Sequence, residues 1–149
     1  MKNVVILLCF IALNSTVFSQ SKKPLQLAKF GDNLESSLSS KEKGFINEVY
    51  GDYANELVYS NQQRLKSFKN ILRNRVLINR YDDKDLSSLT VLSKIPLANS
   101  INPNLLRDDF FDERTFNPLK YNFGFFSNKT TTHYRVDNTS YVITILSQY

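Results

Sequence analysis

The amino-acid sequence predicts an α+β fold, in which a long amphipathic helix, or two helices in series, packs on a C-terminal three-stranded antiparallel sheet. Two patterns support this prediction. Apolar residues recur every three or four positions from Ile46 to Leu57 and again from Leu65 to Val76, as they do along one face of a helix. From Leu119 onward apolar and polar residues alternate, as they do in strands that bury one face. Because a small sheet is stable only when one face is covered, the helical segment is its expected cover.

Residues 1–19 have the pattern of a cleavable secretory signal peptide. Lys2 precedes an uninterrupted apolar run, residues 4–13, and polar residues follow it. Val17 and Ser19 suit the positions that signal peptidase recognises, so cleavage is expected after Ser19. The apolar run is shorter than the roughly 20 residues that span a bilayer, which predicts no transmembrane segment. The mature protein is therefore expected in the periplasm or outside the cell.

The single cysteine, Cys9, lies inside the apolar run and leaves with the signal peptide. The mature chain then has no thiol for a disulfide, a nucleophile or a metal site. No glycine-rich phosphate loop and no common hydrolase motif is present, so no cofactor is predicted. The remaining length suits a single α+β domain, residues 38–149, which follows a polar, basic and poorly ordered leader, residues 20–37.

The helical part of this domain begins with a capping-box pattern, in which Ser39 is followed three residues later by Glu42. Breaks or kinks are expected at Gly51 and at the polar residues 60–63. The apolar stripe that should face the sheet consists of Ile46, Tyr50, Tyr53, Leu57, Leu65, Phe68, Leu72 and Val76.

The middle of the chain has weaker signals. Residues 81–85 have turn chemistry and should end the helical segment. Residues 86–98 are short apolar pieces that fit either a strand or a packed loop. Asn102 before Pro103 is typical of a helix start, which predicts a short helix up to about Phe111.

Three strands are predicted in the C-terminal third, at residues 119–125, 130–136 and 139–146. The first two alternate in polarity, and the third is rich in β-branched and aromatic residues. Turn residues separate them at 128–129 and at 137–138. Short turns between strands of similar length predict an antiparallel meander.

One group of basic residues suggests a binding surface. No acidic residue occurs between Arg64 and Arg80, and Lys66, Lys69, Arg73 and Arg80 have spacings that place them on one side of a helix. We call these four residues the predicted basic face. Such a face would attract an anionic glycan, a lipid surface or an acidic protein partner. The alternative is a solvated flank whose long side chains cover apolar surface.

Other residues have two interpretations each. The acidic group Asp108, Asp109, Asp112 and Glu113 offers oxygen ligands for a hard cation, but its spacing is not that of a calcium loop and a solvated loop fits better. The only histidine, His133, is a candidate general base, although its phase predicts a place on the solvated face of a strand. The aromatic residues of the predicted strands suit carbohydrate or peptide binding if exposed, and a sheet core if buried.

The chain resembles small secreted proteins of Bacteroidetes for which no function is known. The resemblance rests on Phe18-Ser19-Gln20 at the end of the signal, on residues 116–121 and on residues 134–137. It implies a Gram-negative envelope as the setting, and it identifies neither an activity nor a site.

These observations favour a non-enzymatic secreted or periplasmic protein that binds an anionic envelope component or a protein partner. The alternative is a carboxylate-dependent hydrolase that acts on an envelope or extracellular polymer. A cleft with two or more convergent carboxylates would favour the hydrolase, and a basic or aromatic patch would favour binding. The formal net charge of +5 is modest for the whole chain, so no nucleic-acid partner is expected.

Overall fold

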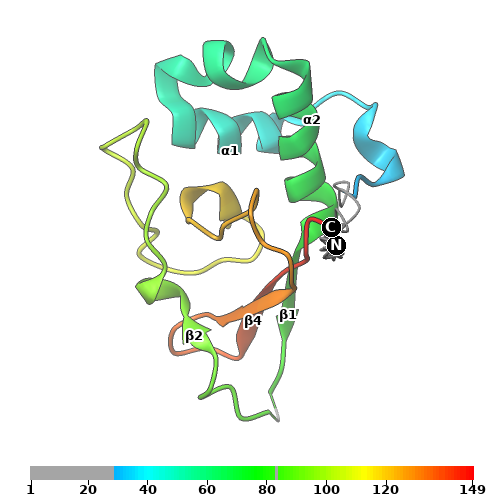
Figure 1. The fold of residues 1–149 in the computed structure, drawn as a ribbon. Helices are drawn as coiled ribbons and strands as arrows, with labels where there is room; N and C mark the ends of the chain where they lie inside the picture. Colours follow the sequence, from blue (N-terminus) through cyan, green and yellow to red (C-terminus); the bar gives the residue numbers. More distant parts are fainter. Residues whose placement is uncertain (1–28, 83) are drawn as a thin grey trace, which may run out of the picture.

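The structure is a computed structural model that describes residues 29–82 and 84–149 (Figure 1). The predicted signal peptide, its cleavage site and residues 20–28 of the predicted leader lie outside the described residues. Within the described part, no helix is both long enough and apolar enough to cross a membrane. The fold class is α+β, as the sequence predicts.

Two α-helices and a four-stranded mixed sheet form the described part of the chain. They are α1 (Ser40–Tyr50), α2 (Gln62–Asn70), β1 (Val76–Arg80), β2 (Thr90–Val91), β3 (Thr132–Arg135) and β4 (Tyr141–Ile145). The strand order is β1-β4-β3-β2, with β4 antiparallel to both of its neighbours and β2 parallel to β3. Two of the three predicted strands, residues 130–136 and 139–146, contain β3 and β4, which are antiparallel as predicted. The prediction is wrong in the number of strands, because the sheet also contains β1 and β2, and β2 makes it mixed rather than antiparallel.

The helical segment forms two helices in series, and it breaks at the two places that the sequence indicates. The Glu42 amide donates to the Ser39 hydroxyl and the Ser39 amide donates to the Glu42 carboxylate, so the predicted capping box is present. α1 ends at Gly51, whose φ of +51° is strained for any residue that has a Cβ. A 3-10 turn and a π turn then lead to Asn61, whose side chain caps α2.

These two turns change which side chains face the core. The 3-10 turn (Gly51–Tyr53) and the π turn (Asn55–Tyr59) do not keep the 3.6-residue period of an α-helix. Within these turns Ala54 and Val58 are buried in place of the predicted Tyr53 and Leu57, and Tyr53 is 55% exposed. The buried hydrophobic residues of the helical segment are Ile46, Val49, Ala54, Val58, Phe68 and Ile71.

β1 follows the second helix without a loop (Figure 1). α2 passes through a π turn (Ile71–Arg75) and the chain becomes extended at Val76, so the predicted helix is wrong for residues 76–80. The strand forms because Val76 and Ile78 pack against the core and pair with Ile145 and Ile143 of β4. Alternation with exposed Leu77 and Asn79 is the pattern of a strand.

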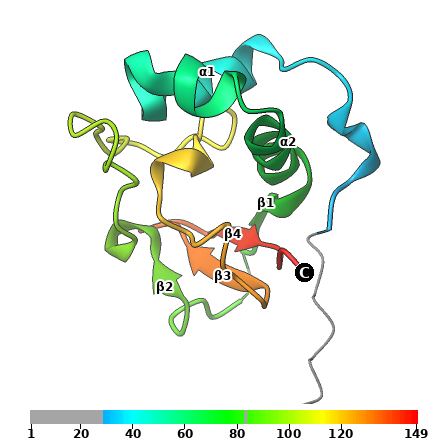
Figure 2. The same cartoon turned by 45° about the horizontal axis from the view of Figure 1, so that its top comes forward.

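The first strand predicted from polarity, residues 119–125, is not part of the sheet. Its first two residues belong to a 3-10 turn (Pro118–Lys120), and the segment lies between the helices and the sheet (Figures 1 and 2). The Asn117 side chain donates to the Phe45 carbonyl of α1 at 2.9 Å, and the Phe123 ring packs on Tyr134 of β3 with 4.9 Å between centroids. The alternation therefore reflects an irregular chain buried between two layers rather than a strand.

The middle of the chain also differs from the prediction. Residues 86–98 contain β2 and a 3-10 turn (Leu92–Lys94). Asn102 forms only a turn, because its side chain accepts from the Asn104 amide without a helix following. This segment leaves Leu106 75% exposed and Phe110 88% exposed.

Candidate functional site

The predicted basic face is divided between two elements. Lys66 and Lys69 lie on α2 and Arg73 lies in the π turn after it, but Arg80 lies on β1. The predicted helical arrangement is therefore wrong for Arg80, because the backbone is extended there. Arg80 pairs with Asp82 at 2.7 Å on the exposed surface.

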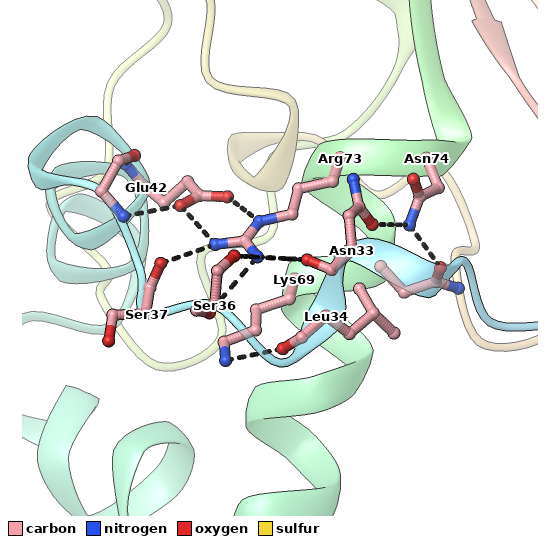
Figure 3. Close-up of polar contacts among 10 residues, drawn as sticks. Asn33, Leu34, Ser36, Ser37, Glu42, Lys69, Arg73 and Asn74 are labelled. Carbon is pink, nitrogen blue, oxygen red and sulfur yellow. Dashed lines mark hydrogen bonds and ion pairs between the residues drawn. The ribbon is translucent and has the colours of Figure 1, made fainter.

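Arg73 is the centre of a polar network that joins two parts of the chain (Figure 3). Its Nε donates to Glu42 Oε1 at 2.5 Å and its Nη2 donates to Glu42 Oε2 at 2.9 Å. The same guanidinium donates to the carbonyl oxygens of Asn33 and Ser37 and to the Ser36 hydroxyl. These hydrogen bonds from Arg73 outweigh burial and lower the pKa of Glu42 to about 2.

Lys69 and Asn70 extend this network along α2. Lys69 Nζ donates to the Leu34 carbonyl at 2.9 Å, and Asn70 Nδ2 donates to the Lys29 carbonyl at 2.8 Å (Figure 3 shows the Lys69 contact). Lys66 is only loosely paired with Glu35, at 3.9 Å. Residues 29–37, assigned to the leader from the sequence, are thus held against α2. Lys69 and Arg73 already have protein partners, and anion binding by the predicted basic face stays a prediction.

A wide hollow lies on another part of the molecule. It has a volume of ≈ 620 Å³ and we call it the aromatic cleft. Phe111 packs on Phe116 at 5.3 Å between ring centroids, and Phe116 stacks on Tyr121 at 5.4 Å. Phe110 stands at its rim with most of its ring in solvent. The remaining lining residues are Leu92, Ser93, Arg107, Asp108, Asp109, Val136, Asp137, Asn138 and Thr139.

Most charged groups of the aromatic cleft are held by protein partners. Arg107 donates to the carbonyls of Leu92 and Ile95, and its guanidinium lies over the Tyr121 ring. Asp108 accepts a hydrogen bond from Lys120 Nζ at 2.5 Å. Burial lowers the pKa of Lys120, but its bonds to Asp108 and Glu48 outweigh burial and leave that pKa above its ordinary value.

Two further carboxylates line the aromatic cleft. Asp137 accepts hydrogen bonds from the Ser93 amide at 2.9 Å and from the Ser93 hydroxyl at 2.6 Å. Burial raises the pKa of Asp137, but the two bonds from Ser93 outweigh burial and keep that pKa below its ordinary value. Asp109 is exposed and has no hydrogen bond or ion pair to any described residue. The cleft therefore holds several carboxylates, the feature that would favour a hydrolase.

A second hollow lies next to the aromatic cleft, on the outer face of the sheet. It has a volume of ≈ 440 Å³, and we call it the Arg135 hollow. Its lining consists of Ser87, Ser88, Leu89, Thr90, Val91, Lys94, Arg135 and Asp137. Arg135 points away from the core because its neighbours Tyr134 and Val136 pack inward. A further polar hollow on the other side of Arg135 is lined by Asn138, Thr139 and Ser140 of the β3–β4 turn, among other residues.

The Arg135 guanidinium has no partner within the described residues. Its Nε is buried and makes no hydrogen bond, and no ion pair joins it to a described carboxylate. Its positive charge helps to lower the pKa of Asp137 against the effect of burial, and its contribution is smaller than that of the hydrogen bonds from Ser93. Arg75, by contrast, is buried but donates to the carbonyls of Phe125 and Leu146 and to Asn128. Arg135 therefore has a buried hydrogen-bond donor that no described residue pairs.

The other candidates from the sequence, His133 and the acidic group, do not form a catalytic or metal site among the described residues. His133 is exposed on β3, as its phase predicts, and its Nδ1 lies 3.0 Å from the Thr144 hydroxyl. In residues 29–82 and 84–149, no group of three or more histidine, cysteine or acidic side chains is placed to hold a metal ion. Asp108 belongs to the aromatic cleft, and Asp112 accepts from the Arg114 amide within a turn.

No protein-family model, curated protein or solved structure matches the chain. The site residues are therefore argued from geometry alone. Sequence reasoning missed Arg135 because an isolated basic residue in an alternating strand is common on solvated faces. Arg135 becomes recognisable as a site residue only beside Ser87, Ser88 and Lys94, and these residues reach it because β2 pairs with β3.

Proposed function

We propose that this protein is exported and binds an anionic group at the Arg135 hollow, without catalysis. The observation that carries the proposal is the buried, unpartnered Nε of Arg135. Buried polar groups are nearly always hydrogen-bonded, and leaving one without a partner costs about 1–3 kcal/mol, or more when the group is charged. A carboxylate, sulfate or phosphate in the hollow would supply the missing acceptor, and arginine binds such groups in a two-pronged geometry.

The surroundings of Arg135 support an anion rather than a neutral ligand. Lys94 adds a second positive charge to the lining, and Ser87, Ser88 and Thr90 add hydroxyl donors. Asp137 is the one acidic residue among the lining residues, and its oxygens already accept from Ser93. The lining therefore has more donors and more positive than negative charge.

The aromatic cleft carries the alternative, a carboxylate-dependent hydrolase. Such an enzyme needs one carboxyl group that stays protonated near neutral pH and a second that acts as base or nucleophile. Asp137 does not suit the first role because its pKa is lowered, and Asp108 is bonded to Lys120. Among the three carboxylates that line the aromatic cleft, only Asp109 has no partner among the described residues. Binding is therefore the better-supported function, and release of reducing ends from an acidic polysaccharide, lost in Asp109→Asn, would favour the hydrolase instead.

The test is a titration with inorganic sulfate, followed by nitrogen-15 NMR of the arginine Nε–H groups. Sodium chloride at the same ionic strength serves as the control for screening. We expect sulfate to shift the Arg135 Nε–H signal at lower concentration than chloride, and the response to disappear in Arg135→Gln. Arg114→Gln removes an exposed arginine elsewhere and is the matched control. Equal shifts with sulfate and chloride would overturn the proposal.

A further inference from the structure

The Arg135 hollow and the aromatic cleft are neighbours on one continuous surface. Asp137 lines both of them, and Asn138 and Thr139 line the aromatic cleft and the polar hollow on the other side of Arg135. Asp137 of the β3–β4 turn, residues 137–140, and its hydrogen-bond partner Ser93 lie at the boundary between the Arg135 hollow and the aromatic cleft. A ligand whose anionic group contacts Arg135 can therefore extend across this turn into the aromatic cleft.

Positive and negative side chains lie at opposite ends of this surface. Arg135 and Lys94 lie at one end. Asp108 and Asp109 lie at the other end, where Arg107 is turned toward backbone carbonyls and Asp108 is bonded to Lys120. A second negative charge on the ligand would be repelled by Asp109. The part of the ligand that enters the aromatic cleft is thus expected to be uncharged.

The lining of the aromatic cleft also indicates what kind of uncharged group fits. The Phe110 ring, 88% exposed, offers an apolar face, while Asp109 and Asn138 offer hydrogen-bond acceptors and donors beside it. A hydrocarbon chain would remove these polar groups from water without replacing their hydrogen bonds, which is costly. A hydroxylated ring has an apolar C–H face for the aromatic side chain and hydroxyl groups for Asp109 and Asn138.

We infer that the ligand is an acidic saccharide, with its carboxylate, sulfate or phosphate on Arg135 and an uncharged sugar ring in the aromatic cleft. This inference rests on the proposed anion-binding function and adds the ligand class to it. The cleft volume of ≈ 620 Å³ lies within the usual range of roughly 300–1,000 Å³ for small-molecule sites.

The experiment titrates the full mature chain with four probes and follows the Arg135 Nε–H signal by NMR. They are inorganic sulfate, glucose, glucose 6-sulfate and hexyl sulfate. We expect glucose 6-sulfate to bind at least about tenfold more tightly than sulfate or hexyl sulfate, which corresponds to about 1.4 kcal/mol. Phe110→Ala should remove this gain but leave sulfate binding unchanged, and Arg135→Gln should abolish binding of all three anions. Tyr53→Ala, an exposed aromatic residue on the helical side, is the matched control and should change nothing.

The outcomes separate the inference from the function on which it rests. If sulfate binds at Arg135 and glucose 6-sulfate binds no better, the saccharide inference is wrong and the anion-binding function stands. If hexyl sulfate binds as tightly as glucose 6-sulfate, the ligand is an anionic amphiphile and the inference is also wrong. If none of the anions shifts the Arg135 signal, the proposed function and the inference both fail.

Discussion

Replacing Glu42 by glutamine tests the claim that the Arg73 network stabilises the fold. The Arg73 and Glu42 side chains are 13% and 14% exposed, so solvent screens their interaction little. The pKa of Glu42 is about 2 in the folded protein, against 4.5 ordinarily. At 1.36 kcal/mol for each unit, this difference corresponds to about 3 kcal/mol of folding free energy at neutral pH. Glutamine keeps the shape and part of the hydrogen bonding, so Glu42→Gln should lose about 2–3 kcal/mol.

The same interaction predicts how the effect changes with pH. A carboxyl whose pKa is depressed by folding contributes its full stability above its unfolded pKa, and loses it as the pH falls toward the folded pKa. The difference between wild type and Glu42→Gln should therefore be largest above about pH 5 and should shrink between about pH 4.5 and 2. Taking the difference cancels the titration of the other carboxyl groups, which both proteins share.

Urea unfolding of both proteins at several pH values, followed by circular dichroism, measures this difference. Lys66→Gln, which removes only the loose pair with Glu35 at 3.9 Å, is the control and should leave the urea midpoint nearly unchanged. Equal midpoints for wild type and Glu42→Gln at pH 7 would refute the reasoning, as would a difference that persists undiminished at pH 2.

Three further predictions concern the backbone, the core and export. Gly51→Ala should destabilise the protein by about 1–3 kcal/mol, because φ at this residue is +51°. Gly44→Ala, in open space within α1, should stabilise the protein by roughly 0.5–1 kcal/mol. Thermal melts in which Gly51→Ala is the more stable variant would contradict the assigned backbone. In denaturant unfolding, Ile71→Ala should lower the free energy of unfolding by about 2–5 kcal/mol because Ile71 is 1% exposed, and Tyr53→Ala should lower it by less than about 0.5 kcal/mol because Tyr53 is 55% exposed. Similar losses for the two variants would show that the core face is misassigned. Exported material should begin at Gln20, and intact masses that retain Met1 would rule out the predicted signal peptide.

Local chemistry in the sequence predicts local structure well. The Ser39–Glu42 capping box and the break at Gly51 are both present, because each depends on contacts within a few residues. The solvated position of His133 follows from strand alternation alone. Features of this kind need no knowledge of the rest of the fold.

The errors arise where tertiary packing decides the conformation. Alternating polarity at residues 119–125 predicts a strand, but the segment is enclosed by helices on one side and by the sheet on the other. The helical period continues through Val76, yet pairing with Ile145 makes residues 76–80 a strand. The candidate site depends on such distant pairing as well, since β2 must lie beside β3 before Lys94 and Arg135 share a hollow.

The strand order also determines when the sheet can form during synthesis. β4 is the partner of both β1 and β3, so β1 has no neighbour in the sheet until β4 has been made. Contacts between residues as distant in sequence as Val76 and Ile145 form slowly, because a long loop must close before they contribute. The helices can form early, but the sheet that they cover cannot. A nascent chain of this topology therefore cannot complete its sheet before residues 141–145 have been synthesised.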